Sequence, residues 1–274
     1  MAKVSKENLS KSEAKKLMAW RRREKEIEKF AKARELQYKQ RTNSKPTQTK
    51  PALEQDVTKT IKKEVPVVET KVGLSQKQLQ SIGFVLGNGT SRRTIDPYSL
   101  KPIGTVYACN AIYRTFDPDY LIAVDVKMCL ELHREGYHKK NPNIWTNPQR
   151  SLTKYKEFNF FNPSKGWSSG PTALWLASQH RYGTIYILGF DYKGLEDGKR
   201  FNNIYADTPN YKKSTDGATF FGNWMRQTSN VIKNHPHINY VRVITQDNYR
   251  PEELNKFDNF KTITIEEFQK LFEI

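Results

Sequence analysis

Cysteine is scarce in this chain of 274 residues, and its apolar runs are short. The 2 cysteines, Cys109 and Cys129, lie in apolar stretches without the spacing of zinc ligands, which is typical of small core residues in a reducing compartment. A membrane-spanning helix needs about 20 apolar residues in succession, and no stretch reaches that length. The first residues also lack the apolar core of a signal peptide. We therefore expect a protein of the cytoplasm, or one packaged in a particle that is assembled there.

Acidic residues are also few relative to basic ones. The chain has 29 aspartates and glutamates and 46 lysines and arginines, which gives a net charge of +17. Residues 1–75 hold 20 basic and 10 acidic residues, a net charge of +10, and the rest of the chain carries +7. This excess predicts an acidic partner, with residues 1–45 as its expected contact. Nucleic acid, an anionic membrane surface and an acidic protein all fit. A tail that only raises solubility is the alternative.

Composition divides the chain into three segments. Residues 1–45 are predicted to form a basic helical tail, because the capping-box pattern Ser10-Lys11-Ser12-Glu13 introduces a charged stretch with a thin apolar stripe. Residues 46–74 contain scattered prolines and no apolar periodicity, which indicates a flexible linker. Residues 75–274 then form an α/β domain in which we expect a nucleotide site.

Short apolar runs alternate with amphipathic stretches throughout this domain. We expect a lead-in helix over 75–82, strands over 84–86, 105–110, 120–125, 143–146, 157–161, 184–189 and 239–245, helices over 126–135, 171–179 and 218–233, and a last strand and helix within 260–272. Such alternation is typical of a parallel sheet that helices cover on both faces. The predicted fold class is therefore α/β, with a Rossmann-like and mainly parallel sheet.

Four of the apolar runs end in small or polar residues. These ends are Gly87-Asn88-Gly89-Thr90-Ser91, Asn110, Asp125 and Gly189-Phe190-Asp191. In a parallel sheet such ends meet at one edge, where ligands bind. Glycine lets the backbone approach a ligand closely, and loop amides donate hydrogen bonds to phosphate. We expect a nucleotide site that includes Gly87, Asn88, Gly89, Ser91, Asn110 and Asp125. At any one of these positions taken alone, a plain turn is the alternative.

A second candidate for anion binding comes directly before the helix expected over 171–179. The stretch Gly166-Trp167-Ser168-Ser169-Gly170 places hydroxyl groups and backbone amides at a helix N-terminus, which favours a negatively charged group. Ser168, Ser169 and Gly170 are therefore predicted to hold a phosphate. Ordinary capping of the helix by Ser168 or Ser169 is the alternative interpretation.

Histidine is scarce as well, with 5 in the chain. His133 and His180 fall on expected helices, which indicates structural or surface roles, and His138 belongs to a basic loop. His235 and His237 flank a proline at a helix end, where a cation suits the helix dipole. No carboxylate or cysteine accompanies that pair, so we predict no metal site.

Four of these motifs, taken in order, resemble those of a known enzyme family. Gly87-Asn88-Gly89-Thr90-Ser91, Cys109-Asn110, Ser168-Ser169-Gly170 and Ile187-Leu188-Gly189-Phe190-Asp191 resemble the bacterial alpha-2,3-sialyltransferases that use CMP-sialic acid. The stretches 117–125 and 171–191, with Tyr205-Ala206 beyond, are similar to the related motility-associated factor and hydroxymethylpterin-diphosphokinase-like proteins. The resemblance covers about residues 82–206. It implies a Rossmann-like fold and a nucleotide-sugar donor, most simply a CMP-linked one.

The resemblance also implies roles for single residues of the expected nucleotide site. Asn88 and Asn110 match asparagines that hold the donor nucleotide in the sialyltransferases. Ser169 and Gly170 match a Ser-Gly pair that contacts the donor. Asp125 stands where the pterin-kinase-like branch has an aspartate, which suits a ribose or magnesium contact, although magnesium is not required.

The chain departs from the family at the catalytic group. The sialyltransferases use a histidine as general base after a tyrosine-bearing loop, and the matching residues 210–216 contain no histidine. A hydroxyl that attacks a sugar carbon benefits from a positioned base. Asp191, which matches the aspartate after the central strand, is therefore a candidate catalytic residue together with Asp216 and Tyr205.

Two functions from different classes remain open. The first is a nucleotide-sugar-dependent, sialyltransferase-like glycosyltransferase, which the polar strand ends favour. The second is a non-catalytic binding or structural protein that keeps the fold and is anchored by residues 1–45. Its anchor would be nucleic acid or a nucleoprotein particle such as a virus capsid. The missing histidine and the basic tail favour this second function.

Overall fold

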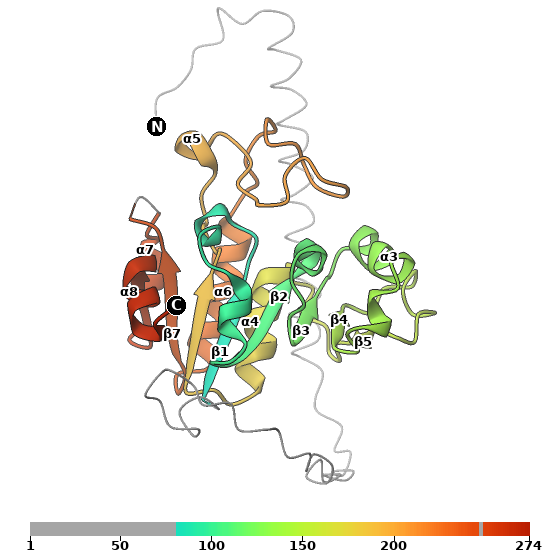
Figure 1. The fold of residues 1–274 in the computed structure, drawn as a ribbon, viewed down its shortest axis with the longest axis horizontal. Helices are drawn as coiled ribbons and strands as arrows, with labels where there is room; N and C mark the ends of the chain where they lie inside the picture. Colours follow the sequence, from blue (N-terminus) through green and yellow to red (C-terminus); the bar gives the residue numbers. More distant parts are fainter. Residues whose placement is uncertain (1–80, 247–248) are drawn as a thin grey trace, which may run out of the picture. The chain divides into compact units, whose positions relative to one another are not determined.

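The apolar run before Gly87 folds as strand β1 (Ile82–Leu86), and all of its residues are buried. The computed structural model describes residues 81–246 and 249–274, in which β1 belongs to an eight-stranded sheet. The strand order is β5-β4-β3-β2-β1-β6-β7-β8, and every neighbouring pair is parallel (Figure 1). The predicted α/β, Rossmann-like fold is thereby confirmed.

Helices and further strands follow β1 in the alternating order that the sequence predicts. The other strands are β2 (Thr105–Cys109), β3 (Tyr120–Ile122), β4 (Ile144–Thr146), β5 (Asn159–Phe160), β6 (Thr184–Leu188), β7 (Asn239–Ile244) and β8 (Phe260–Thr264). The helices are α3 (Val126–Arg134), α4 (Ser169–Gln179), α5 (Leu195–Gly198), α6 (Gly222–Asn234), α7 (Glu252–Asn255) and α8 (Ile265–Phe272). Four short 3-10 helices complete the set: η1 (Thr90–Arg92), η2 (Pro97–Leu100), η3 (Asn110–Arg114) and η4 (Tyr137–Lys139).

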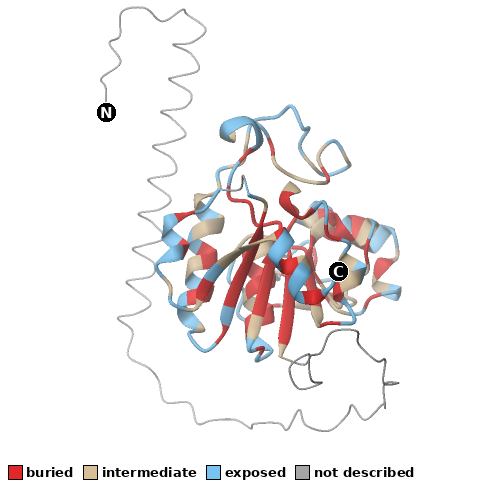
Figure 2. Cartoon of the chain, turned by 60° about the vertical axis from the view of Figure 1, so that its left-hand side comes forward, coloured by how far each residue is buried: buried red, intermediate tan, exposed pale blue. Residues whose placement is uncertain are grey.

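Side chains of the strands alternate between two cores, one on each face of the sheet. In β1, Phe84 and Leu86 belong to the first core and Val85 to the second, as the two-residue period of a strand requires. Residues of η2, η3, α3 and α8 complete the first core, and residues of α4, α6 and α7 complete the second. Figure 2 shows the strands buried between these layers, while the outer faces of the helices are exposed.

The strand order reverses beside β1. From β1 the chain moves outward through β2, β3, β4 and β5, and α4 then returns it to the other side of β1, where β6 begins. The loops that follow β1 and β6 therefore leave the sheet in opposite directions. Such a reversal opens a crevice beyond the carboxyl ends of the strands, which is where open α/β sheets bind ligands.

Most expected elements are present, with shifts at their ends. The helix expected over 171–179 begins earlier, at Ser169, and the helix expected over 218–233 begins later, at Gly222. The strand expected over 120–125 ends at Ile122, because Asp125 is already the N-cap residue of α3. The predicted tail, the linker and residues 75–80 of the lead-in helix lie outside the described residues. The last two positions of that helix are not helical, because Ser81 lies in a turn and Ile82 begins β1. No helix of the described part has the length and apolarity to cross a membrane.

Candidate functional site

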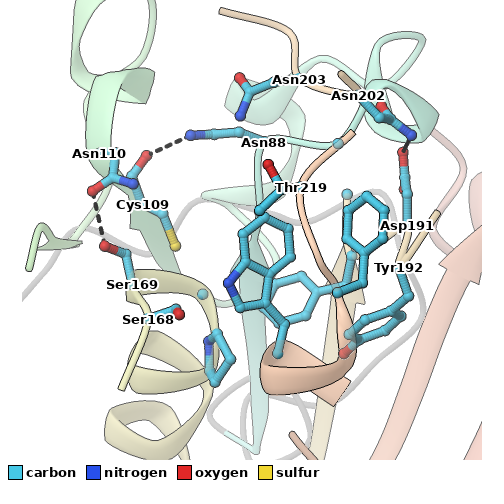
Figure 3. A pocket seen from close by; sticks show the side chains of 18 of the residues that line it. Asn88, Cys109, Asn110, Ser168, Ser169, Asp191, Tyr192, Asn202, Asn203 and Thr219 are labelled. Atoms are coloured by element: carbon cyan, nitrogen blue, oxygen red, sulfur yellow. Dashed lines mark hydrogen bonds between the residues drawn. The ribbon is translucent and has the colours of Figure 1, made fainter. Parts of the chain in front are cut away.

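A cavity of about 600 Å³ lies at the point where the strand order reverses. Its walls come from the residues that follow β1, β2, β3 and β6, from the start of α4, from the start of α6 and from residues 201–212. Figure 3 shows Asn110, Ser168 and Ser169 on one side of it, with Asp191 and Tyr192 on the other. Most of the predicted site residues line it: Gly87, Asn88, Gly89, Asn110, Asp125, Ser168, Ser169, Gly170 and Asp191.

The two glycines after β1 are needed for close packing against the loop after β6. A Cβ atom on Gly87 would lie 2.5 Å from the carbonyl oxygen of Gly189, and one on Gly89 would lie 2.5 Å from the carboxyl group of Asp191. The amides of Gly87 and Gly89 donate to the carbonyls of Leu188 and Gly189 at 2.8 and 2.9 Å. Both amides are therefore hydrogen-bonded within the protein. The prediction that this loop binds a phosphate requires free amide donors, and the loop offers few of them.

Asp191 joins the loops that surround the cavity. Its carboxylate accepts hydrogen bonds from the amide of Ser91 at 3.1 Å, from the hydroxyl of Ser91 and from the Asn202 amide group at 3.0 Å. Asn202 in turn accepts from the amide of Thr90 at 3.0 Å. Asp191 and Ser91 are both buried, and Ser91, which the sequence placed in the nucleotide site, does not line the cavity. This carboxylate therefore stabilises the loops, and its oxygens are occupied by donors.

The side-chain amide of Asn88 is also hydrogen-bonded within the protein. Its Nδ2 donates to the Cys109 carbonyl and to the Tyr211 hydroxyl, each at 3.1 Å, and its Oδ1 accepts from Arg92 at 3.4 Å. Arg92 is buried and donates from Nε to the Gly87 carbonyl at 2.5 Å. Arg92 thus fixes the loop instead of reaching a ligand, and Asn88 holds Tyr211 over the cavity.

Asn110 is arranged differently, because its amide nitrogen makes no hydrogen bond to any other described residue. The Ser169 hydroxyl accepts from the Val124 amide at 3.2 Å, so its own proton goes to Asn110 Oδ1 at 2.9 Å. This bond fixes the orientation of the Asn110 amide, with Nδ2 as the group that is free to donate. Asn110 has a φ of 54°, a left-handed conformation that asparagine tolerates better than most residues.

The start of α4 forms one end of the cavity. Ser168 is the N-cap residue, but its side chain makes no capping hydrogen bond. The alternative that Ser168 caps the helix with its side chain is therefore wrong. Instead, the Ser168 amide donates to Gln227 of α6 at 3.1 Å. The amides of Ser169 and Gly170 come before the first intrahelical hydrogen bond and have no partner within the helix. With the helix dipole, these amides favour a negatively charged group.

Asp125 is the second carboxyl group of the cavity. It is exposed to the cavity, yet desolvation by the surrounding wall raises its pKa above the ordinary value. A raised pKa on a cavity carboxyl suits a group that accepts or delivers a proton. The neighbouring thiol of Cys109 does not suit nucleophilic chemistry, because burial raises its pKa to about 12.

Two predicted catalytic residues lie outside the cavity lining. Tyr205 is buried in the first core, and its hydroxyl is 3.0 Å from the Thr115 hydroxyl. Asp216 is exposed and accepts a hydrogen bond from the Lys213 amide at 2.9 Å within its own turn. The structure therefore does not bring Tyr205 or Asp216 together with Asp191.

Sequence reasoning missed the aromatic wall of the cavity. This wall consists of Trp167, Phe190, Tyr192, Phe201, Tyr211, Phe221 and Trp224. Asn203, Thr219 and the cations Lys193 and Lys212 also line the cavity, and no histidine is among the described lining residues. One signal was available, because a crossover helix of a parallel sheet begins at the carboxyl edge. The start of the helix after 218, with Phe221 and Trp224, is therefore expected at the edge of the sheet where the cavity lies.

Comparison of the chain with protein-family models, curated proteins and solved structures gives no match. The resemblance to the sialyltransferases therefore stays a prediction from the motifs.

Proposed function

We propose that the cavity binds a nucleotide-linked sugar, with a CMP-linked donor as the expected class, and that the protein transfers the sugar to an acceptor hydroxyl. The observation that carries this proposal is the meeting of three features in one cavity: a helix N-terminus with free amides, an oriented asparagine amide and an aromatic wall. Each of the three suits one part of a nucleotide sugar.

The phosphate is assigned to the start of α4. Ser169 and Gly170 supply backbone donors there, and the Ser168 hydroxyl is not engaged in capping. Lys193 and Lys212 add positive charge to the cavity, which balances the charge of a phosphate.

The nucleoside is assigned to the aromatic wall and Asn110. Aromatic side chains stack on the flat faces of bases, and an amide N–H recognises an acceptor on the base edge or the ribose. Burial raises the pKa of the Tyr211 phenol well above its usual range, so the hydroxyl stays protonated at neutral pH. Its position over the cavity, which the bond from Asn88 fixes, suits a ligand contact.

Asp125 is the residue we assign as general base, in place of Asp191. Asp191 is tied by Ser91 and Asn202, whereas the carboxyl of Asp125 faces the cavity. In the transfer, the acceptor oxygen forms a bond to the anomeric carbon of the sugar. The bond from that carbon to the phosphate oxygen breaks, its electron pair leaves with the nucleotide, and the acceptor proton moves to Asp125. Bound magnesium would help the nucleotide to leave, but no step requires it.

Calorimetric titration with CMP, CMP-sialic acid, UDP-sugars, GDP-sugars and ATP, with and without magnesium, tests the nucleotide site. The matched variant is Asn110→Asp, because an aspartate keeps the acceptor for Ser169 and tolerates the left-handed backbone while it removes the N–H donor. We expect the variant to bind the preferred nucleotide at least about tenfold more weakly, since one hydrogen bond is lost and a negative charge faces the phosphate.

The control is Asn239→Asp, which makes the same change at an exposed position where β7 begins, the edge opposite the cavity. Its affinity should equal that of the unchanged protein. No binding of any nucleotide, or equal affinities in both variants, would rule out the proposed site.

A non-catalytic nucleotide-binding protein is the second candidate. The absence of a histidine among the described lining residues and the use of Asp191 to hold the loops favour it. The two functions differ in turnover. If the protein releases CMP from a bound donor, and the rate of this release is lower in Asp125→Asn, it is an enzyme. Tight donor binding without CMP release at any acceptor concentration indicates the binding protein.

A further inference from the structure

Two histidines and a glutamate gather outside the cavity lining. His133 lies in the last turn of α3, His138 lies in η4 and Glu157 lies in the turn before β5. One ligand atom of each residue lies within 4.8 Å of the ligand atoms of the other two. The cluster therefore joins the end of a helix to a loop that is distant from it in the sequence.

The contacts within the cluster leave a buried ring nitrogen of His138 without a partner among the described residues. His133 Nδ1 and Glu157 Oε1 form a hydrogen-bonded pair, and the imidazole rings of His133 and His138 stack with their centroids 5.5 Å apart and their planes at 13°. The Nδ1 atom of His138 is buried and has no hydrogen-bond partner among the described residues. A buried polar atom without a partner costs free energy until a ligand satisfies it.

The donor set indicates the class of ligand. Two imidazoles and one carboxylate are a set that binds zinc and leaves a fourth position open, and four residues separate the histidines, which is within the usual range for zinc sites. With zinc–ligand bonds of about 2.0–2.2 Å, tetrahedral geometry places ligand atoms about 3.3–3.6 Å apart. The ligand atoms of the cluster, all within 4.8 Å of one another, are already close to this spacing.

The surroundings discriminate against hard cations. Magnesium and calcium take mainly oxygen ligands, and only one carboxylate is present in the cluster. The chain neighbours Lys139 and Lys156 are cations, which disfavours a site that holds its ion by charge alone. Imidazole nitrogen suits zinc and its neighbours in the transition series.

We propose that His133, His138 and Glu157 form a binding site for a divalent transition metal ion, with zinc as the expected ion. The ion takes the place of the proton in the hydrogen bond between His133 and Glu157, and one imidazole nitrogen of His138 completes its protein ligands. Its binding clamps the loop before β5 onto the end of α3. The sequence predicted no metal site because the carboxylate lies far along the chain from both histidines.

The test is a zinc titration of the full chain without a polyhistidine tag, after removal of metal with a chelator. A competing chromogenic chelator reports the affinity, and cobalt binding followed by its visible absorption reports nitrogen ligation. We expect one ion per chain, with a rise in melting temperature on addition of zinc. His138→Gln and Glu157→Gln should each weaken the affinity at least about tenfold.

The matched control is the double variant His235→Gln, His237→Gln. It removes another histidine pair, with ring centroids 6.2 Å apart, that no carboxylate joins in a metal-binding group of the described residues. Its zinc affinity should equal that of the unchanged chain. Equal affinity in Glu157→Gln, which keeps a hydrogen-bond acceptor for His133 and therefore the fold, would overturn the proposal. So would loss of binding in the control.

Discussion

Asn88 and Asn110 carry the same side chain to the same cavity, yet their amide groups have different neighbours. Asn88 donates to Cys109 and Tyr211, whereas the oxygen of Asn110 is held by Ser169 and its nitrogen is left to donate. A residue type at a strand end therefore does not define a role. The role follows from which of its donors and acceptors the protein already uses.

Replacement of Asn88 should affect stability first. Asn88→Ala leaves the buried Cys109 carbonyl without its donor and releases Tyr211, so we expect the free energy of unfolding to fall by about 1–3 kcal/mol. Chemical denaturation followed by circular dichroism measures this change. By contrast, Asn110→Asp should stay within about 1 kcal/mol of the unchanged protein, because its bond to Ser169 remains. The opposite order of the two effects would contradict the assigned roles.

The raised pKa of Asp125 leads to a pH-dependent effect on stability. Its folded pKa lies above the unfolded value of 3.8, so the ionised carboxyl opposes folding. Well below pH 3.8 the group is protonated in both states and the penalty is absent; the penalty grows as the pH rises from 3.8 to the folded pKa and is fully present above it. Asp125→Asn removes the charge and should therefore raise the melting temperature at pH 7.

The comparison across pH is the check on Asp125. The difference in melting temperature between Asp125→Asn and the unchanged protein should shrink as the pH is lowered from the folded pKa toward 3.8, and vanish well below it, where both carry a neutral side chain. A lower melting temperature of Asp125→Asn at pH 7 would contradict the assignment.

At the scale of elements, a side chain of β7 holds the loop that follows β6. Arg242 of β7 is buried and donates to the carbonyls of Phe190 at 2.8 Å, Asp191 at 3.2 Å and Tyr249 at 2.6 Å. Its guanidinium also lies 5.2 Å from the ring centroid of Tyr192. One side chain thus fixes a whole wall of the cavity through backbone atoms.

Arg242→Met should therefore weaken both stability and ligand binding. The substitution leaves buried carbonyls without donors, and it relieves the cost of burying a guanidinium, so we expect a net loss of about 2 kcal/mol in the free energy of unfolding. Denaturant titration measures it. Arg226→Met, at an exposed arginine of α6, is the control and should stay within about 0.5 kcal/mol. Equal stability of the two variants would show that Arg242 does not anchor the loop.

The elements were largely predictable, and the partners of their end residues were not. Apolar runs such as 84–86 and 184–189 mark strands because both faces of a parallel sheet are buried. The location of the cavity follows, since carboxyl ends meet at one edge. Residues 199–217 have no periodic pattern, however, and contacts from this stretch decide what Asn88 and Asp191 do. The cluster of His133, His138 and Glu157 was missed for the same reason, because tertiary packing alone brings Glu157 to His133.

At the scale of the whole molecule, charge separates the chain into parts with different expected partners. The net charge is +10 over residues 1–75 and +7 over the rest, although the rest is far longer. A cavity that binds one nucleotide needs only a few cations, such as Lys193 and Lys212. The dense charge of the first segment instead suits a polyanion, with nucleic acid as the case that is simplest to test.

Deletion of residues 1–74 should therefore weaken nucleic-acid binding and leave nucleotide binding unchanged. Each phosphate that a lysine or arginine neutralises releases a counterion, so the affinity of the full chain for duplex DNA should fall steeply with salt, and the deletion should flatten this dependence. Replacement of Arg21, Arg22 and Arg23 by glutamine should reduce the slope of log K against log salt by up to about 3. Fluorescence anisotropy with labelled DNA measures these slopes, and CMP titration of the shortened chain is the control. Equal affinity and equal slope with and without the tail would exclude nucleic acid as its partner.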